Sequence, residues 1–332
     1  MQNRQLGPLT VSSIGLGCMS MSHAYGAPDQ AESERTLLAA LDQGYTFFDT
    51  AALYGFGANE SLVGRVLSTR RKEFVLASKC GMRKGPDGKR EINGRPEVIR
   101  QTCHESLDRL QTEVIDLYYL HRWDRNVPIE DSVGELSRLL EEGKIRAIGL
   151  SEVSADTLRK AHLTHPIAAL QSEYSLWSRN PEIAVLKTCR ELGVGFVPFS
   201  PLGRAFLTGT LRDPEALVEG DLRRSMPRFQ GDHFQRNLEL LESYESIAKD
   251  AGCTMAQLAL AWVLAQGDDM VPIPGTWHTA YAAENALAAD VTLSEKTLSD
   301  LDALINQKTV SGPRYNATTQ TEIDTEEFDL VN

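Results

Sequence analysis

The chain alternates between short apolar runs and longer segments with helical periodicity, and this alternation restricts its fold more than any other feature. Eight apolar runs rich in β-forming residues occur in order, at residues 13–17, 46–51, 73–79, 114–121, 145–151, 167–173, 194–200 and 270–275. Within these runs the apolar residues are consecutive, which is typical of strands buried on both faces. Strands of this kind belong to parallel sheets covered by helices, so we expect an α/β fold.

Helices are predicted in the segments between the apolar runs. They cover residues 33–43, 59–67, 96–110, 130–143, 154–163, 181–192, 237–252 and 255–267. Pro96 sits at a first helical position, and Ser154 is a capping residue type at the start of its helix. Gly44 stops the first helix, because glycine readily adopts the left-handed conformation that ends a helix. Strands and helices together predict a series of about eight β/α units.

Repeated β/α units are compatible with an open doubly wound sheet or with a closed barrel. Segment GLGCMSMS (15–22) has only two glycines of a G-x-G-x-x-G turn, which does not favour the open dinucleotide-binding sheet. A closed barrel needs about 250 residues. The chain has 332 residues, which leaves room for extensions. We therefore predict a single domain over residues 1–332: a (β/α)8 TIM barrel with an N-terminal hairpin, a long loop after the seventh strand (203–233) and a C-terminal extension (308–332).

Composition and charge exclude several classes of partner. The formal net charge of −12 disfavours binding to nucleic acid or to an anionic membrane, because both need a basic protein surface. No apolar run approaches the roughly 20 residues of a membrane span, and the N-terminus lacks a signal-peptide core. The five cysteines form no C-x-x-C pair and indicate a reducing compartment. We expect a cytoplasmic protein with a small-molecule substrate, no metal and no nucleic-acid or membrane partner; the oligomeric state stays open.

Four ionisable side chains lie at or just after the ends of neighbouring predicted strands. Asp49 lies at the end of the second strand, Lys79 ends the third and His121 the fourth, while Tyr54 follows shortly after Asp49. The carboxyl ends of barrel strands meet on one rim, where barrel enzymes hold their active sites. A carboxylate, a phenol, an ammonium and an imidazole on one rim indicate a site that transfers protons.

Charge suggests a role for each of these four side chains. The Lys79 ammonium is expected to lower the pKa of Tyr54, so that the phenol acts as a general acid nearer neutral pH. Asp49 would keep Lys79 charged and oriented, and His121 would hydrogen-bond a carbonyl oxygen or relay a proton. Each residue taken singly also has a structural interpretation, as a rim ion pair, a loop anchor or a structural histidine. Their joint placement favours catalysis.

Several motifs, in the same order, resemble those of the aldo-keto reductase superfamily over nearly the whole chain. The matching stretches are FFDTAALYGFGANESLVG (47–64), LASKCG (76–81), DLYYLHRWD (116–124), IRAIGLSE (145–152), QSEYSLWSR (171–179), PFSPLGRAFLTG (198–209) and IPGT (273–276). The pattern is similar to bacterial aldo/keto reductases and to the branch that includes potassium-channel β-subunits. Asp49, Tyr54, Lys79 and His121 match the family's catalytic tetrad. The resemblance implies an NAD(P)H-dependent oxidoreductase that reduces an aldehyde or ketone to an alcohol, and the reverse, with Tyr54 as proton donor.

The resemblance also implies positions that bind the nicotinamide cofactor. They are Gly17, Met19, Asp49, Ser151, Glu152, Gln171, Phe199, Ser200, Pro201, Leu202, Gly203, Leu207, Gly275, Thr276, Trp277, His278, Glu284 and Asn285. Ser151 and Gln171 match residues that hydrogen-bond the carboxamide. Phe199 takes the place of an aromatic residue that stacks on the nicotinamide ring. Glu152 stands where many relatives have asparagine.

Substrate contacts are expected from side chains that lie in or follow the strand-end loops. Aromatic and apolar side chains predominate in ligand pockets. The candidates for substrate contact are Tyr25, Tyr54, His121 and Trp123, with Trp177 and Arg204 as further candidates for the pocket rim.

One departure from the family pattern concerns the choice of cofactor. Relatives that prefer NADPH usually carry Lys or Arg shortly after the IPG motif, whereas this chain reads GTWHTAYAAEN (275–285) and has neither. Loss of a charge-assisted phosphate contact weakens discrimination for NADPH. We expect NADP(H) as the favoured cofactor on the family pattern, with NAD(H) as the alternative.

Two other functions stay open on the sequence. Lys79 would form a Schiff base with the substrate if the protein were an aldolase-type barrel enzyme. A cofactor-binding regulatory or redox-sensing subunit with little turnover would resemble the potassium-channel β-subunits. The neighbours of Lys79 and the cofactor motifs argue against the first, and no basic or apolar docking tail supports the second.

Overall fold

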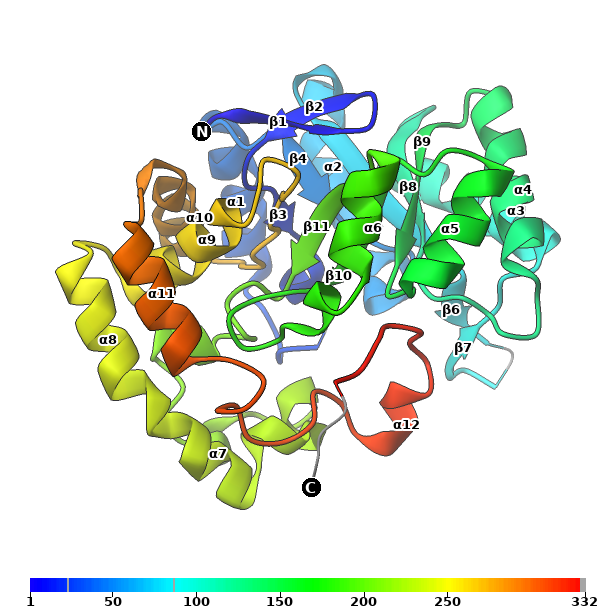
Figure 1. Cartoon of the computed structure of the whole chain (residues 1–332). Helices are drawn as coiled ribbons and strands as arrows, with labels where there is room; N and C mark the ends of the chain where they lie inside the picture. The colour runs from blue at the N-terminus through cyan, green and yellow to red at the C-terminus, as the bar shows by residue number, and fades with distance from the viewer. Residues whose placement is uncertain (23, 86, 329–332) are drawn as a thin grey trace.

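Seven parallel strands curve around a common axis in the computed structural model, which describes residues 1–22, 24–85 and 87–328 (Figure 1). The strands are β3 (Leu16–Gly17), β4 (Phe47–Asp49), β5 (Val75–Cys80), β8 (Ile115–Leu120), β9 (Ile145–Ser151), β10 (Ala169–Glu173) and β11 (Gly195–Phe199). Their order in the sheet is β11-β10-β9-β8-β5-β4-β3. Each strand overlaps one of the first seven predicted runs, so the parallel sheet is confirmed.

The eighth predicted strand closes the barrel without forming a regular strand. Segment 270–275 lies between β11 and β3 and bridges to both. The amides of Val271 and Ile273 donate to β11 carbonyls at 2.8 and 3.0 Å, and the carbonyls of Pro272 and Pro274 accept from amides on the β3 side at 2.9 and 3.2 Å. Proline has no amide to donate, so half of the ladder to β3 is missing. The (β/α)8 barrel is confirmed, but its last strand is incomplete.

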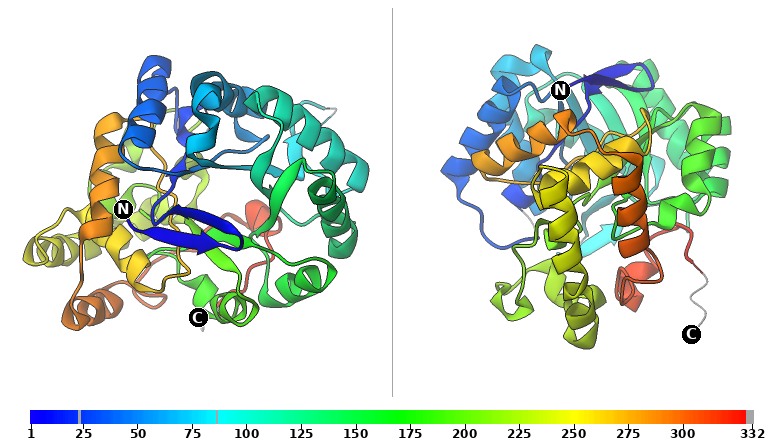
Figure 2. Two further views of the ribbon diagram at one scale, coloured as in Figure 1. Left: turned by 90° about the horizontal axis from the view of Figure 1, so that it is seen from above. Right: turned by 60° about the vertical axis from the view of Figure 1, so that its left-hand side comes forward.

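Helices alternate with the strands and form the outer layer of the barrel (Figure 2). They are α1 (Gln30–Asp42), α2 (Ala58–Leu67), α3 (Pro96–Leu110), α4 (Ile129–Glu141), α5 (Ala155–Thr164), α6 (Val185–Leu192), α9 (Met255–Ala265) and α10 (Thr279–Leu287). The predicted end signals hold: Ser154 caps α5 by accepting from Thr157 N, α3 begins at Pro96, and Gly44 has φ +90° just after α1. Helix α10 lies outside the predicted set.

Several elements lie outside the β/α repeat. The predicted N-terminal hairpin consists of β1 (Asn3–Leu6) and β2 (Leu9–Ser12), and it lies across the amino-terminal end of the barrel (Figure 2). A second hairpin, β6 (Met82–Lys84) and β7 (Arg90–Ile92), follows β5 and was not predicted. The expected long loop ends in α7 (Gly231–Leu238), which is separate from α8 (Leu240–Asp250), so the single helix predicted over 237–252 is wrong at its start. Helix α11 (Glu295–Leu304) was also missed.

Two apolar layers hold the barrel together. The inner layer lies inside the sheet and includes Phe47, Leu117 and Val197 from the strands with Leu6 and Val11 from the hairpin. The outer layer packs the strands against the surrounding helices. A barrel filled in this way is a packed core and not a pore. Space for a ligand is therefore expected at the carboxyl ends of the strands.

The C-terminal segment, defined as residues 311–328, returns across the carboxyl end of the barrel, opposite the N-terminal hairpin (Figure 1). It contains the short helix α12 (Ala317–Gln320) and is anchored at the start of α5. Asp324 Oδ2 accepts from Ser154 N and Oγ at 3.2 and 2.9 Å, and Glu326 Oε1 accepts from Ala155 N at 2.7 Å. A helix N-terminus favours such carboxylates. The polar extension expected from the sequence is thus part of the barrel rim.

The described part of the chain contains no disulfide, no metal site and no membrane span. All five cysteines are unpaired thiols. Residues 1–22, 24–85 and 87–328 hold no cluster of His, Cys, Asp and Glu suited to a metal ion. None of their helices is both long and apolar enough to cross a bilayer.

Candidate active site

Asp49, Tyr54, Lys79 and His121 converge at the carboxyl ends of three adjacent strands. Asp49 ends β4, Lys79 lies one residue before the end of β5, and His121 directly follows β8. Tyr54 begins the short 3-10 helix η2 (Tyr54–Gly57). All four side chains are buried, and Lys79 has 0% of its surface exposed. The fold therefore brings the four predicted groups to one place.

Lys79 is the centre of this cluster. Its Nζ donates to Asp49 Oδ1 at 2.5 Å, to Thr50 O at 2.8 Å and to Tyr54 Oη at 3.3 Å. The other carboxylate oxygen of Asp49 accepts from Gln171 Nε2 at 2.8 Å. An ammonium has three donors, and all three are used here. A fully buried ammonium is stable only when it is paired and hydrogen-bonded, so these contacts keep Lys79 charged.

Burial and neighbouring charge act on the pKa of Tyr54 in opposite directions. Burial raises the pKa of the phenol, the Lys79 ammonium lowers it, and the net direction is upward. The sequence predicted a lowered pKa and was wrong here, because it reveals the ammonium but not the depth of burial. For Lys79, burial lowers the pKa, but Asp49 and Tyr54 raise it and prevail. At neutral pH the site thus holds a protonated phenol beside a charged ammonium.

His121 faces Tyr54 across the site. The two rings meet edge to face, with centroids 5.9 Å apart and an interplanar angle of 84°. Both residues and Asp49 line one cavity of about 890 Å³ at the carboxyl end of the barrel. A carbonyl oxygen placed between the phenol and the imidazole would meet two hydrogen-bonding groups, which is the arrangement that stabilises developing charge on oxygen.

The same cavity brings together most positions assigned to the cofactor. Those that line it are Gly17, Met19, Asp49, Ser151, Gln171, Phe199, Ser200, Pro201, Leu202, Gly275, Thr276, Trp277, His278, Glu284 and Asn285. Tyr25 and Arg204 line it as well. At Gly17 a larger residue would not fit, since a Cβ there would lie 2.9 Å from the Ile273 carbonyl oxygen.

Other predicted positions do not line the cavity. Trp177 is a core residue that stacks on Phe206 with ring centroids 4.2 Å apart, and Leu207 is also fully buried in the core. Trp123 Nε1 donates to a backbone carbonyl of its own loop at 2.9 Å. Gly203, with φ +56°, packs beneath Trp177. These residues support the shape of the loops, and local packing partners hold the side chains of Trp177, Leu207 and Trp123 away from the cavity.

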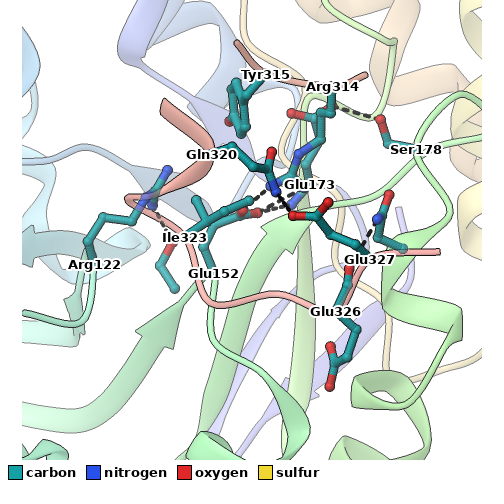
Figure 3. Close-up of polar contacts among 12 residues, drawn as sticks. Arg122, Glu152, Glu173, Ser178, Arg314, Tyr315, Gln320, Ile323, Glu326 and Glu327 are labelled. Carbon is teal, nitrogen blue, oxygen red and sulfur yellow. Dashed lines mark hydrogen bonds and ion pairs between the residues drawn. The ribbon is translucent and has the colours of Figure 1, made fainter. Parts of the chain in front are cut away.

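Glu152 also departs from its predicted contact with the cofactor. Its carboxylate accepts from both terminal nitrogens of Arg314 and from Glu173 N, the last at 2.8 Å (Figure 3). The residue has φ +56°, and Ser200, which follows β11, has φ +49°. Left-handed backbone is strained for residues other than glycine and clusters at functional sites. The strained backbone of Glu152 and Ser200 thus lies at the rim of the barrel. The Glu152 side chain nevertheless contacts the C-terminal segment and does not line the cavity.

A buried network of charges joins the rim to the C-terminal segment. Arg204 Nη2 donates to Glu173 Oε2 at 2.7 Å and to Tyr315 Oη at 3.0 Å. Figure 3 shows Arg314 and Tyr315 lying over Glu152 and Glu173. Burial raises the pKa of Glu173, but Arg204 and Arg314, together with the Ser178 hydrogen bond and Arg228, lower it by more. The sequence missed Arg314 and Tyr315, because they stand in a tail without periodicity, 162 residues from the partner of Arg314.

Segment 275–285 contributes aromatic and polar side chains to the wall of the cavity. The rings of Trp277 and His278 lie 3.6 Å apart between centroids, and Tyr281 meets His278 at 5.1 Å. Trp277, His278, Tyr281, Glu284 and Asn285 all line the cavity. No Lys or Arg occurs in this segment. A ligand bound against this segment would therefore contact aromatic rings, neutral polar groups and one carboxylate, but no Lys or Arg.

Comparisons with known proteins agree with this geometry. A model of the aldo/keto reductase family matches residues 13–306. The chain is 45% identical over 318 residues to aldo-keto reductase yakc [NADP(+)] of Schizosaccharomyces pombe, covering 94% of each chain. It is 47% identical over 309 residues to probable aldo-keto reductase 1 of Glycine max, covering 92% of this chain and 88% of the relative. Among solved structures, glycerol dehydrogenase AKR11B4 of Gluconobacter oxydans superposes with a TM-score of 0.85 at 28% identity, covering 94% of this chain and 97% of that one.

Proposed function

The chain belongs to the aldo/keto reductase family, and we propose on this premise that it reduces an aldehyde or ketone to an alcohol with NADP(H), and catalyses the reverse reaction. The observation that carries the proposal is the buried Lys79, which contacts Asp49 and Tyr54 at the wall of the large cavity. Such a cluster places a proton donor and a fixed positive charge where an oxygen would gain negative charge.

The shape of the cavity supports a dinucleotide cofactor. A volume of about 890 Å³ is large for a single small substrate, since small-molecule sites span roughly 300–1,000 Å³. Phe199 and Trp277 line the same cavity as the tetrad residues that reach it. Gly17 and Gly275 form a parallel bridge, and because neither residue has a Cβ their backbones pack closely at the cavity wall. A nicotinamide cofactor bound in this cavity would supply the hydride.

In the proposed reaction the tetrad handles the oxygen and the proton. His121 and Tyr54 orient the carbonyl oxygen, and Tyr54 donates its proton to this oxygen as the alcohol forms. Lys79 stabilises the phenolate that remains, and Asp49 holds Lys79 in place. In the reverse direction the phenolate accepts the proton of the alcohol. All four side chains are buried, which limits their contact with bulk water during this transfer.

The choice between NADP(H) and NAD(H) turns on residues 275–285, several of which line the cavity. The relative from Schizosaccharomyces pombe is named for NADP(+), which favours NADP(H) for this chain. Residues 275–285 contain no Lys or Arg to pair with a 2′-phosphate, which supports tolerance of NAD(H). We propose NADP(H) as the preferred cofactor with a modest margin over NAD(H).

The rival Schiff-base mechanism receives little support from the site. A lysine that attacks a carbonyl must be neutral, and such lysines have lowered pKa values. The pKa of Lys79 is instead raised by Asp49 and Tyr54, against the effect of burial. Borohydride trapping of a carbonyl substrate on Lys79 would favour that mechanism over the reductase.

A carbonyl panel combined with a cofactor titration tests the proposed function. Binding of NADPH and NADH is followed by quenching of tryptophan fluorescence, and oxidation of each cofactor is followed with a panel of aldehydes and ketones. We expect both cofactors to bind and at least several aldehydes to be reduced. Cofactor binding without turnover of any carbonyl would contradict the proposal and favour a regulatory subunit.

A further inference from the structure

We propose that the substrate carries a carboxylate near its carbonyl group and that Arg122 binds this carboxylate. The inference rests on the proposed function and narrows its substrate class to oxo acids. Arg122 follows His121 directly at the end of β8 and lines the same cavity as Tyr54. None of the sequence motifs assigned it a role.

One terminal nitrogen of the Arg122 guanidinium makes hydrogen bonds within the protein, and the other two nitrogens make none among the described residues. Its Nη1 donates to the His121 carbonyl oxygen at 2.6 Å and to Ser151 Oγ at 3.2 Å. Among the described residues, no hydrogen bond is made by Nε or Nη2 of Arg122. An arginine has five N–H donors in a planar fork. The fixed Nη1 therefore orients a fork with three donors left to offer to a ligand.

The charge of Arg122 is also uncompensated, in contrast to the other cations of the cavity wall. Those cations each have a carboxylate partner, in the ion pairs Arg90–Glu322, Arg204–Glu173 and Arg223–Asp221. Arg122 forms no ion pair with any residue in 1–22, 24–85 or 87–328. A half-buried cation without a counter-ion favours an anionic ligand.

The position of Arg122 indicates where on the substrate this anion lies. Its positive charge acts on Tyr54 and works to lower the pKa of the phenol, against the larger effect of burial. Arg122 also directly follows His121 and donates to its carbonyl oxygen, so the backbone places this cation beside the tetrad. A planar fork binds a carboxylate through two parallel hydrogen bonds. This geometry selects short oxo acids over neutral carbonyl compounds.

A competing interpretation is that Arg122 acts only through Ser151. In that case its contact with Ser151 Oγ would position this residue for the cofactor, and substrate charge would be irrelevant. The two interpretations differ in what a charge-removing substitution changes. Loss of a carboxylate contact affects acids alone, whereas loss of a positioning contact affects every substrate and the cofactor.

Matched substrates separate these interpretations. Phenylglyoxylate is compared with its methyl ester, and pyruvate with methyl pyruvate, in wild type, Arg122→Gln and Arg122→Lys. Arg65→Gln is the control, because it removes one positive charge from an exposed ion pair that joins α2 to α1. We expect Arg122→Gln to lower kcat/KM for at least one acid by about 10- to 100-fold and for its ester by less than about threefold. Arg122→Lys should recover part of the loss, and Arg65→Gln should change nothing.

A binding measurement provides a second readout that does not depend on turnover. Mandelate and methyl mandelate are titrated by calorimetry into protein saturated with NADP+. Arg122→Gln should weaken mandelate about tenfold or more and leave both methyl mandelate and NADP+ unchanged. Equal losses for acid and ester, or a matching loss of NADP+ affinity, would overturn the carboxylate site. If wild type reduces esters but neither acid, this inference fails alone; if it reduces no carbonyl, the proposed function fails with it.

Discussion

At the scale of single residues, the chemistry of the site depends on a balance between burial and charge at Tyr54. Burial raises the pKa of the phenol, and Lys79, 3.3 Å from its oxygen, lowers it. The net direction is upward, so Tyr54 keeps its proton through neutral pH. A general acid in this condition loses activity only when alkali removes its proton. The role of Lys79 is therefore to limit the rise of the pKa and to stabilise the phenolate after transfer.

This balance predicts the pH dependence of reduction. The kcat for carbonyl reduction should be flat through neutral pH and fall only above the ordinary tyrosine pKa of about 10, since the active phenol is the protonated form. Lys79→Met removes the group that lowers the pKa, so the alkaline limb should move to higher pH while kcat itself falls. The profile is measured in wild type, Lys79→Met and Lys308→Met as an exposed control. An alkaline limb that moves to lower pH in Lys79→Met would contradict this account.

At the scale of elements, the C-terminal segment is joined to β9 and α5 by buried charges. Arg314 pairs with Glu152, which directly follows β9, and both side chains are almost fully buried. Asp324 and Glu326 then hold the segment at the N-terminus of α5. A buried ion pair adds little net stability to the folded state, because both charges lose their hydration on burial. Removing one partner strongly destabilises the fold, because the other charge stays buried without a counter-ion.

Removal of one partner should therefore cost more than removal of both. Arg314→Met leaves Glu152 as an unpaired buried carboxylate and should lower the free energy of unfolding by about 3–5 kcal/mol. The double variant Glu152→Gln with Arg314→Met should recover most of this loss, because the amide oxygen of glutamine keeps an acceptor for Glu173 N while no buried charge remains. Urea unfolding measures all three proteins. Arg212→Met, from an exposed pair, is the control and should change stability by less than about 1 kcal/mol. A double variant no more stable than Arg314→Met alone would rule out this coupling.

Elements differ in how well local sequence predicts them. Helix α3 was predicted at its observed bounds, because Pro96 and a regular apolar stripe mark it. Segment 270–275 was predicted as a strand, but Pro272 and Pro274 leave its ladder incomplete. The C-terminal segment has no periodicity, and its position depends on contacts such as Arg314 with Glu152, which no local pattern records. The sequence thus did not predict the long-range ion pairs that place the C-terminal segment beside the site.

At the scale of the whole molecule, alternation of strands and helices was sufficient to predict the barrel and the meeting of the tetrad on its rim. Asp49, Lys79 and His121 lie on different strands, and closure of the sheet brings them together. The direction of the pKa of Tyr54 was not predictable, because it depends on burial that only the closed fold creates. Glu152 and Trp123 also depart from prediction, since tertiary partners turn their side chains from the cavity.

The central claim is that Tyr54 donates the proton in carbonyl reduction, and Tyr54→Phe tests it most directly. This change removes the hydroxyl and keeps the ring, so the barrel and the cofactor path should be preserved. Steady-state kcat with a reducible aldehyde and the NADPH dissociation constant are measured in wild type and variant. We predict a fall in kcat of about 10²- to 10⁴-fold with NADPH affinity unchanged within about threefold. A variant that turns over at the wild-type rate would contradict the account.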